Sequence, residues 1–255
     1  MNKKQLVLSL IILVTCSYGL MAKETAKAAW EQLVGKTYNS EAYRFVKNNP
    51  KLPNVLIYGD SISIAYTPTV RKELAGKANV YRIFMNGVHS GHLIRCMKKM
   101  ESVMRNKDLK DPWNFKWDII LFNVGLHDLR YDLKGDQKEH NASPRVYGKH
   151  LKKILKYFKS IAPHATIIFT TTTPVPKGAT DRVAGDAVIY NDVALAIMKT
   201  HKDIIINDLY SLTKPHHKEW VVGPGNAHFN YKGYTAHGIQ TAAVILKQLT
   251  KRAQK

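Results

Sequence analysis

Short apolar runs alternate with longer segments of helical period along this chain. Five runs are rich in β-branched and apolar residues: 54–58, 80–84, 117–122, 166–170 and 203–206. Each has the length of a strand, and its apolar residues are continuous rather than alternating, which predicts a strand covered on both faces. The pattern therefore predicts five buried strands.

Helical period is clearest between residues 147 and 161. The apolar positions fall on one face of a helix, and five lysines take the rest: Tyr147, Leu151, Ile154, Leu155, Phe158 and Ile161 against Lys149, Lys152, Lys153, Lys156 and Lys159. An N-terminal helix and lead-in are expected within 23–50 and a closing helix within 230–254. Strands alternating with amphipathic helices predict a three-layer α/β/α sandwich around a parallel sheet.

Polar stretches at 106–116, 131–143 and 174–181 are expected to be loops. In an open parallel sheet, ligands bind in the crevice at the carboxyl ends of the strands. Residues that directly follow each predicted strand are therefore the first candidates for chemistry.

The first 22 residues have the pattern of an export signal. Lys3 and Lys4 precede an apolar stretch over 6–14, which is shorter than the roughly 18 residues needed to span a bilayer. Cleavage after Gly19 or Ala22 is compatible with the small residues there, whereas Cys16 offers a lipid anchor if its surroundings act as a lipoprotein box. We expect a protein exported to the periplasm or the extracellular space, with a surface lipoprotein as the alternative.

The remaining 23–255 are expected to form one catalytic domain and a monomer. If Cys16 leaves with the signal or carries lipid, Cys96 is the one thiol left, so no intramolecular disulfide can form. Loss of Lys3 and Lys4 leaves 37 basic against 19 acidic residues, a net charge of +18. Such a charge favours binding to an acidic polysaccharide or an anionic membrane. The alternative is a lysine-rich surface that only keeps the protein soluble. The sequence has no nucleic-acid-binding motif, so nucleic acid is not an expected partner.

Candidate chemistry follows the first predicted strand. Gly59 and Asp60 lead into Ser61 on a tight turn that opens a helix, where backbone N–H groups and the helix dipole favour negative charge. Ser61 can equally be a helix cap. Residues 85–92 and 123–129 follow the next two strands, and His228 precedes the last helix. A serine with a distant histidine is the nucleophile and base of acyl transfer.

This arrangement resembles the SGNH (GDSL-type) hydrolase family over nearly the whole mature chain. The resemblance implies a flavodoxin-like five-stranded sheet of order 2-1-3-4-5, Ser61 as nucleophile and His228 as general base. It also implies an oxyanion hole made by the N–H groups of Ser61 and Gly91. Gly91 is preferred over Gly87 because the family's second block runs Asn, four residues, Gly, as from Asn86 to Gly91.

Two positions depart from the family pattern. His127 stands where the family's Asn donates to the oxyanion, and a neutral imidazole has one N–H that can replace it; a structural histidine is the alternative. Gly225 stands where the family has the triad Asp. A backbone carbonyl of Gly225 or Pro224 is then expected to orient His228, or else a carboxylate from elsewhere: Glu219, Asp208 or Asp186.

Further polar residues surround this predicted crevice. Asp60, Asp128, His89, His92 and Arg130 are expected to support the site or contact substrate, with Arg95 and the loop over 132–140 as weaker candidates. The spacing of the histidines matches no known metal-ligand pattern, so no metal and no cofactor are expected.

The sequence thus predicts a secreted serine esterase that removes acetyl or another small acyl group from a carbohydrate, with an acidic polysaccharide as the expected substrate. Two alternatives remain open. One is altered chemistry on an anionic glycan, as a glycosidase using Asp60 and Asp128 or as a sulfatase. The other is a relative that binds glycan without catalysis.

Overall fold

The computed structural model describes residues 23–37, 39–134 and 137–254. The predicted export signal and Cys16 lie outside the described residues, as does the cleavage site. None of the described helices is both long enough and apolar enough to cross a membrane.

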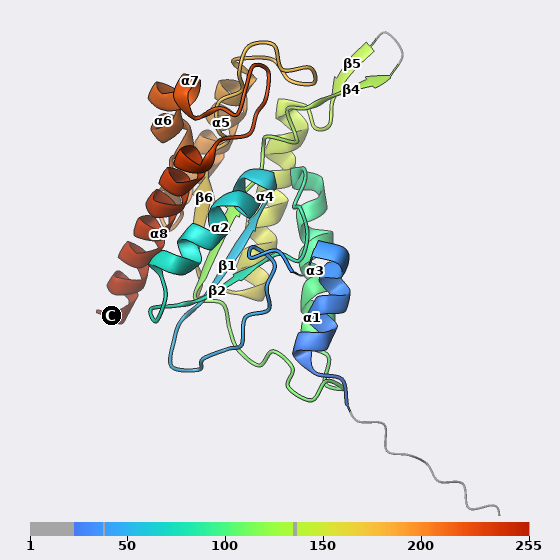
Figure 1. Cartoon of the computed structure of the whole chain (residues 1–255), viewed down its shortest axis with the longest axis vertical. Coiled ribbons are helices and arrows are strands. Elements are labelled where there is room, and N and C mark those ends of the chain that lie inside the picture. The colour runs from blue at the N-terminus through green and yellow to red at the C-terminus, as the bar shows by residue number, and fades with distance from the viewer. Residues whose placement is uncertain (1–22, 38, 135–136, 255) are drawn as a thin grey trace, which may run out of the picture.

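Five parallel strands form the central sheet (Figure 1). They are β1 (Asn54–Gly59), β2 (Asn79–Arg82), β3 (Ile119–Asn123), β6 (Thr166–Thr170) and β7 (Ile205–Asn207). The order β2-β1-β3-β6-β7 corresponds to 2-1-3-4-5 when the sheet strands are counted along the chain, and every pair is parallel. The predicted fold class and strand order are confirmed.

Helices cover both faces of this sheet. On one face α2 (Ser61–Glu73) packs against α8 (Tyr231–Ala253); the other carries α3 (Leu93–Met104), α4 (Pro144–Ile161) and α5 (Asp186–Met198), with α1 (Ala26–Val34) against α3. Two short helices, α6 (Leu209–Thr213) and α7 (His217–Trp220), precede the last loop. Three 3-10 turns span Gly35–Thr37, Ser90–His92 and Lys214–His216.

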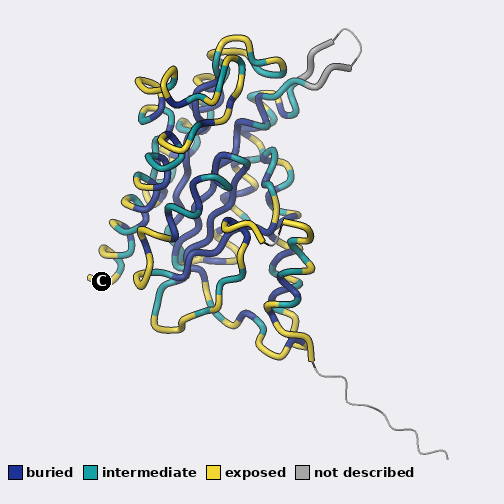
Figure 2. Tube along the Cα trace, viewed as in Figure 1, coloured by how far each residue is buried: buried dark blue, intermediate teal, exposed yellow. Residues whose placement is uncertain are grey.

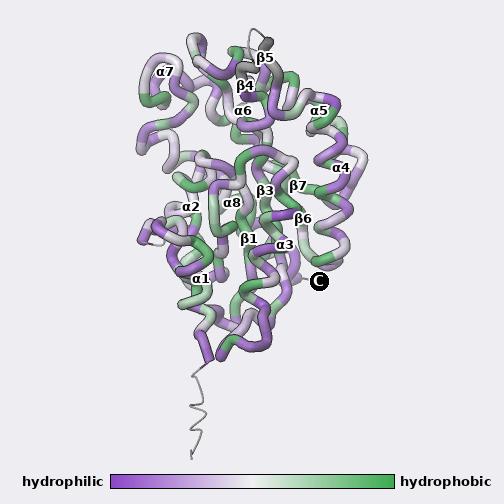
Figure 3. Tube along the Cα trace, turned by 90° about the vertical axis from the view of Figure 1, so that its right-hand side faces the viewer, coloured by the Kyte–Doolittle hydropathy of each residue, from purple (hydrophilic) through white to green (hydrophobic). Residues whose placement is uncertain are grey.

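The core is continuous through the strands. Every residue of β1 and β3 is buried, and the tube coloured by burial is dark along the sheet (Figure 2). Hydrophobic residues concentrate in the same strands, while the outer helices carry polar faces (Figure 3). This explains the continuous apolar runs, because a strand with helices on both sides has no solvent face. Cys96 is buried and unpaired.

The segment over 131–143 differs from the expected loop. It forms an antiparallel hairpin of β4 (Tyr131–Lys134) and β5 (Gln137–His140), which projects from the body of the molecule (Figure 1). The rings of Tyr131 and His140 lie 4.0 Å apart, and both side chains contact the carboxylate of Asp186 at 3.3 Å. The base of the hairpin is therefore held to α5, a contact between distant segments that local sequence pattern does not reveal.

Candidate active site

Ser61 is the first residue of α2, directly after β1. The carboxylate of Asp60 caps the helix by accepting a hydrogen bond from the N–H of Ile62 at 3.0 Å. Gly59 permits the tight turn, because a Cβ there would lie 2.7 Å from Oγ of Ser63. The N–H of Ser61 lies in the first turn of the helix, where backbone donors have no intrahelical acceptor, so it can bind an anion.

A buried arginine holds this turn through hydrogen bonds to its backbone. Arg82, the last residue of β2, is fully buried. Its guanidinium donates to the carbonyls of Gly59 and Asp60, at 2.8 and 3.2 Å, and to Oγ of Ser63 at 2.8 Å. Further bonds reach the carbonyls of Ile83 and Met85. Sequence reasoning missed Arg82, although a charged residue inside an apolar strand was a signal that it bonds internally.

Ser61 and His228 meet across the crevice. Oγ of Ser61 lies 2.9 Å from Nε2 of His228, although the two residues are far apart in sequence. His228 lies in the loop between α7 and α8, whose ends are joined by the bridge between Val221 and Phe229. The first strand end and the last loop thus bring together a hydroxyl and an imidazole at hydrogen-bond distance.

Asn226 holds the other side of the His228 ring. Its Oδ1 accepts from the backbone N–H of His228 and also lies 2.9 Å from ring Nδ1. A backbone N–H can only donate, so the atom that faces it must be the amide oxygen. Nδ1 must then carry the hydrogen, and Nε2 is left with its lone pair towards Ser61. This is the tautomer that a general base needs.

None of the expected orienting groups contacts Nδ1. Asp208 caps α6 and bonds Thr171 and Ser211; Glu219 pairs with Lys232; Asp186 bonds the hairpin. Gly225 has a φ of +71°, and a Cβ on it would lie 2.5 Å from the carbonyl oxygen of Gly178. The chain therefore has no room for a side chain at position 225, and the amide one residue later takes the place beside the imidazole.

The second strand-end loop is anchored by Asp128. This buried carboxylate accepts from the N–H and the hydroxyl of Ser90, and Oγ of Ser90 also lies 2.8 Å from Nδ1 of His150 on α4. The N–H of the adjacent Gly91 donates to Nδ1 of His89 at 3.2 Å. Asp128 thus positions the turn that presents Gly91. His150, which sequence reasoning missed, joins this network from a distant helix.

His127 is partly buried at the third strand end. Burial lowers its pKa to about 4, and the positive charges of Arg182 and Arg130 act in the same direction. The ring is therefore neutral near pH 7 and has one N–H to donate. Its peptide is fixed because Asn141 donates to the His127 carbonyl at 2.8 Å.

The pKa of His228 is also lowered, by partial desolvation and then by the charge of Arg182. The imidazole is therefore unprotonated near neutral pH, which suits a proton acceptor. The two buried carboxyl groups near the site have raised rather than lowered pKa values. Burial raises the pKa of Asp60 to about 6 and that of Asp128 to about 7. Both are fully buried and bound to backbone N–H groups.

The remaining predicted residues lie around this end of the sheet. The rings of His89 and His92 are 4.2 Å apart. Partial desolvation, and then the charge of Arg95, which is exposed on α3, lower the pKa of His92. Nε of Arg130 lies 2.8 Å from the carboxylate of Asp181. Within the described part of the chain, no three His, Cys, Asp or Glu residues are grouped so that they could hold a metal ion.

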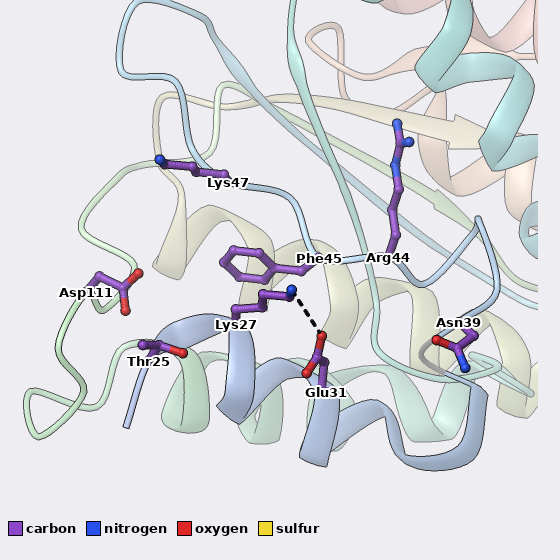
Figure 4. Close-up of a pocket in the computed structure, with 8 residues that line it drawn as sticks. All are labelled: Thr25, Lys27, Glu31, Asn39, Arg44, Phe45, Lys47 and Asp111. Carbon is purple, nitrogen blue, oxygen red and sulfur yellow. Dashed lines mark ion pairs between the residues drawn. The ribbon is translucent and has the colours of Figure 1, made fainter. Parts of the chain in front are cut away.

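A groove of about 780 Å³ lies away from Ser61 and His228, between α1 and the segment that leads into β1 (Figure 4). Lys27 and Glu31 form an ion pair there, beside the ring of Phe45. The residues that line this groove hold no hydroxyl beside an imidazole, so it lacks the groups of the Ser61 site.

Comparison with known proteins shows the family of the chain. The model of the GDSL-like lipase/acylhydrolase family matches residues 57–236, from β1 into α8. The chain belongs to this family. It is therefore a hydrolase of the esterase and lipase type. No curated protein matches the sequence.

Solved structures of other enzymes share the fold at low identity. The lipase/acylhydrolase from Enterococcus faecalis superposes with a TM-score of 0.57 at 17% identity, covering 78% of this chain and 96% of the other. A family 3 carbohydrate esterase from Talaromyces cellulolyticus gives 0.55 at 12%, covering 78% and 99%. A family 2 carbohydrate esterase with a carbohydrate-binding domain from Corynascus thermopiles gives 0.53 at 14%, covering 81% and 69%. These similarities concern the fold.

Proposed function

We propose that this GDSL hydrolase is an exported serine esterase that removes acetyl or another small acyl group from a carbohydrate. The proposal is carried by one observation: Oγ of Ser61 lies 2.9 Å from Nε2 of a histidine whose Nδ1 is held by Asn226. Export is supported by the pattern of the first 22 residues, and carbohydrate as substrate by two structural neighbours that are themselves carbohydrate esterases.

The proposed reaction follows from the positions of these groups. Oγ of Ser61 attacks the ester carbonyl carbon while its proton moves to Nε2 of His228. The carbonyl oxygen becomes an oxyanion, which accepts hydrogen bonds from the backbone N–H groups of Ser61 and Gly91 and from the ring N–H of His127. The bond to the alcohol oxygen breaks, and His228 gives its proton to that oxygen.

Water then completes the cycle. It attacks the acyl–Ser61 carbonyl, its proton moves to His228 and from there to Oγ of Ser61, and the free acid leaves. The N–H of Gly91 donates to His89 over 3.2 Å in the resting site, so the oxyanion displaces a long hydrogen bond rather than a short one.

The alternatives have less support from the geometry. A glycosidase needs two carboxyl groups that flank the scissile bond, but Asp60 and Asp128 are fully buried and occupied by backbone donors. A protein that only binds glycan has no need for a hydroxyl and an imidazole in the tautomer of a nucleophile and its base.

The test compares the wild type with Ser61→Ala, using 4-nitrophenyl acetate and acetylated acidic polysaccharides. We expect acetate release that falls to background in the variant. Ser40→Ala, an exposed serine outside the crevice, is the matched control and should retain the wild-type rate. Equal activity in Ser61→Ala and wild type, or no ester hydrolysis in the wild type, would overturn the proposal.

A further inference from the structure

A guanidinium lies beside His228 in a hollow of about 280 Å³. One wall of this hollow consists of Thr180, Asp181 and Arg182, which precede α5, and the other of Pro224 to His228. Arg182 lines the hollow although its side chain is only 12% exposed. A fixed positive charge therefore lies next to the proposed base.

Arg182 is held in one orientation. Its Nε donates to the carbonyl of Leu126, the residue before His127, at 2.9 Å, and its Nη1 donates to Asp181 at 2.6 Å. The second carboxylate oxygen of Asp181 lies 2.8 Å from Nε of Arg130. Two arginines thus share one carboxylate, which leaves a net charge of about +1. Nη2 of Arg182 makes no hydrogen bond to any residue that the structure describes.

This charge is unfavourable for the protonation of His228 unless an anion accompanies it. Desolvation, and then the charge of Arg182, lower the pKa of both His228 and His127. Arg182 therefore opposes the formation of an imidazolium at His228. An anion bound to Arg182 would reduce this repulsion during the step in which His228 becomes protonated. The arrangement is therefore suited to a substrate that brings its own negative charge.

The position of Arg182 indicates which half of the ester carries that charge. His228 must return its proton to the departing alcohol, so the groups beside His228 face the alcohol rather than the acyl group. Planar guanidinium groups bind carboxylates through paired hydrogen bonds and do so more strongly than neutral donors. A carboxylate on the alcohol half is the anion that this geometry fits.

We propose that Arg182, held by Asp181 and the Leu126 carbonyl and backed by Arg130, binds a carboxylate on the alcohol half of the ester. The substrate is then an acylated uronic acid or a similar acylated hydroxy acid. This inference rests on the proposed esterase function and adds a specificity-determining residue to it.

The test uses two substrates that differ in one charge: a methyl O-acetylgalacturonoside and the methyl ester of the same sugar. We expect the wild type to release acetate from the free acid with a kcat/KM at least about tenfold higher. In Arg182→Gln the ratio of the two values should fall to near 1, and in Arg182→Lys it should be intermediate because charge remains without the planar fork. Thermal unfolding checks that both variants fold.

The overall positive surface also attracts anions, so a matched control is needed. Arg44→Gln removes one exposed arginine of the groove in Figure 4, away from the crevice, and should keep the wild-type ratio. A wild type with equal kcat/KM for both substrates would overturn the inference even if Ser61→Ala abolishes hydrolysis, and so would a preference that survives in Arg182→Gln.

Binding of methyl galacturonoside, measured by calorimetry, gives a result that does not depend on turnover. Binding by the wild type that weakens at least about tenfold in Arg182→Gln supports the carboxylate site. Equal binding by both proteins overturns it. If no ester is hydrolysed at all, the esterase proposal fails, while the calorimetric result still decides whether Arg182 binds a carboxylate.

Discussion

The side-chain oxygen of Asn226 accepts two hydrogen bonds from His228, one from the backbone N–H and one from ring Nδ1, both at 2.9 Å. The contact sets the tautomer and the plane of the imidazole without supplying a charge. A carboxylate in the same place would also stabilise the imidazolium, so the amide provides orientation but not that electrostatic support.

Replacing Asn226 separates these two contributions. Asn226→Ala should lower kcat/KM for 4-nitrophenyl acetate on the order of 10- to 100-fold, because the ring loses its fixed tautomer. Asn226→Asp keeps the acceptor and adds a negative charge, which raises the pKa of His228. The acid limb of its pH–rate profile should then move to higher pH. Wild-type kinetics in Asn226→Ala would show that the contact does not orient the base.

Gly225→Asp places the family's residue at its usual position, yet we expect it to fail as a triad acid. It should lower the free energy of unfolding by about 1 to 3 kcal/mol, because an L-residue is strained at a φ of +71° and its Cβ meets Gly178. Urea unfolding measures the loss.

A second glycine separates the two causes of this loss. Gly76 has a φ of +70° and open space around its Cβ, so Gly76→Asp should cost the backbone strain alone and destabilise the protein less. A Gly225→Asp variant that is as stable as the wild type and more active would contradict the prediction.

His127 is expected to act on the transition state rather than on substrate binding. His127→Ala should reduce kcat by roughly 10²- to 10³-fold with little change in KM, because it removes one donor to the oxyanion. His127→Asn, which restores the family's amide donor, should recover most of this loss. Steady-state kinetics on 4-nitrophenyl acetate check both variants. Failure of Asn to rescue would favour a structural role for the imidazole, because the hydrogen bond from Asn141 to the His127 carbonyl is kept in both variants.

Much of the fold was predictable because each buried strand carries a continuous apolar run. The positions of Ser61 and His228 were predictable, because Ser61 follows the first strand and both residues match the family's sequence pattern. Their catalytic roles stay predictions. Asn226 was not predictable, because its contact depends on the conformation of one loop. Arg82 was missed for a different reason: its role depends on carbonyls from a neighbouring strand, and sequence does not show which carbonyls a buried charge will reach.

Stability should depend on pH through His237, which lies on α8 away from the crevice. The ring is fully buried, donates to Thr213, and has its pKa lowered by burial to about 4. The unfolded chain therefore binds a proton near pH 6.5 that the folded protein takes up only near 4. The stabilisation is complete above pH 6.5 and is lost as the pH falls towards 4.

The loss amounts to at most about 3.5 kcal/mol, since one pKa unit corresponds to about 1.4 kcal/mol. Burial of Asp128 acts in the opposite direction over a similar range, so the comparison must be between proteins rather than between pH values. His237→Gln cannot titrate, and its stability relative to the wild type should improve steadily from pH 7 to pH 4 in urea unfolding. A constant difference would contradict the assignment.

The buried guanidinium of Arg82 also affects how the molecule opens. The carbonyl oxygens of Gly59 and Asp60 stabilise this charge by accepting hydrogen bonds, so local unfolding of the turn would leave a cation in the core without these acceptors. Backbone amides around the end of β1 should therefore exchange their hydrogens for deuterium mainly through global unfolding. The turn that presents Ser61 would then belong to the slowest-exchanging part of the protein, whereas active-site loops in general open early.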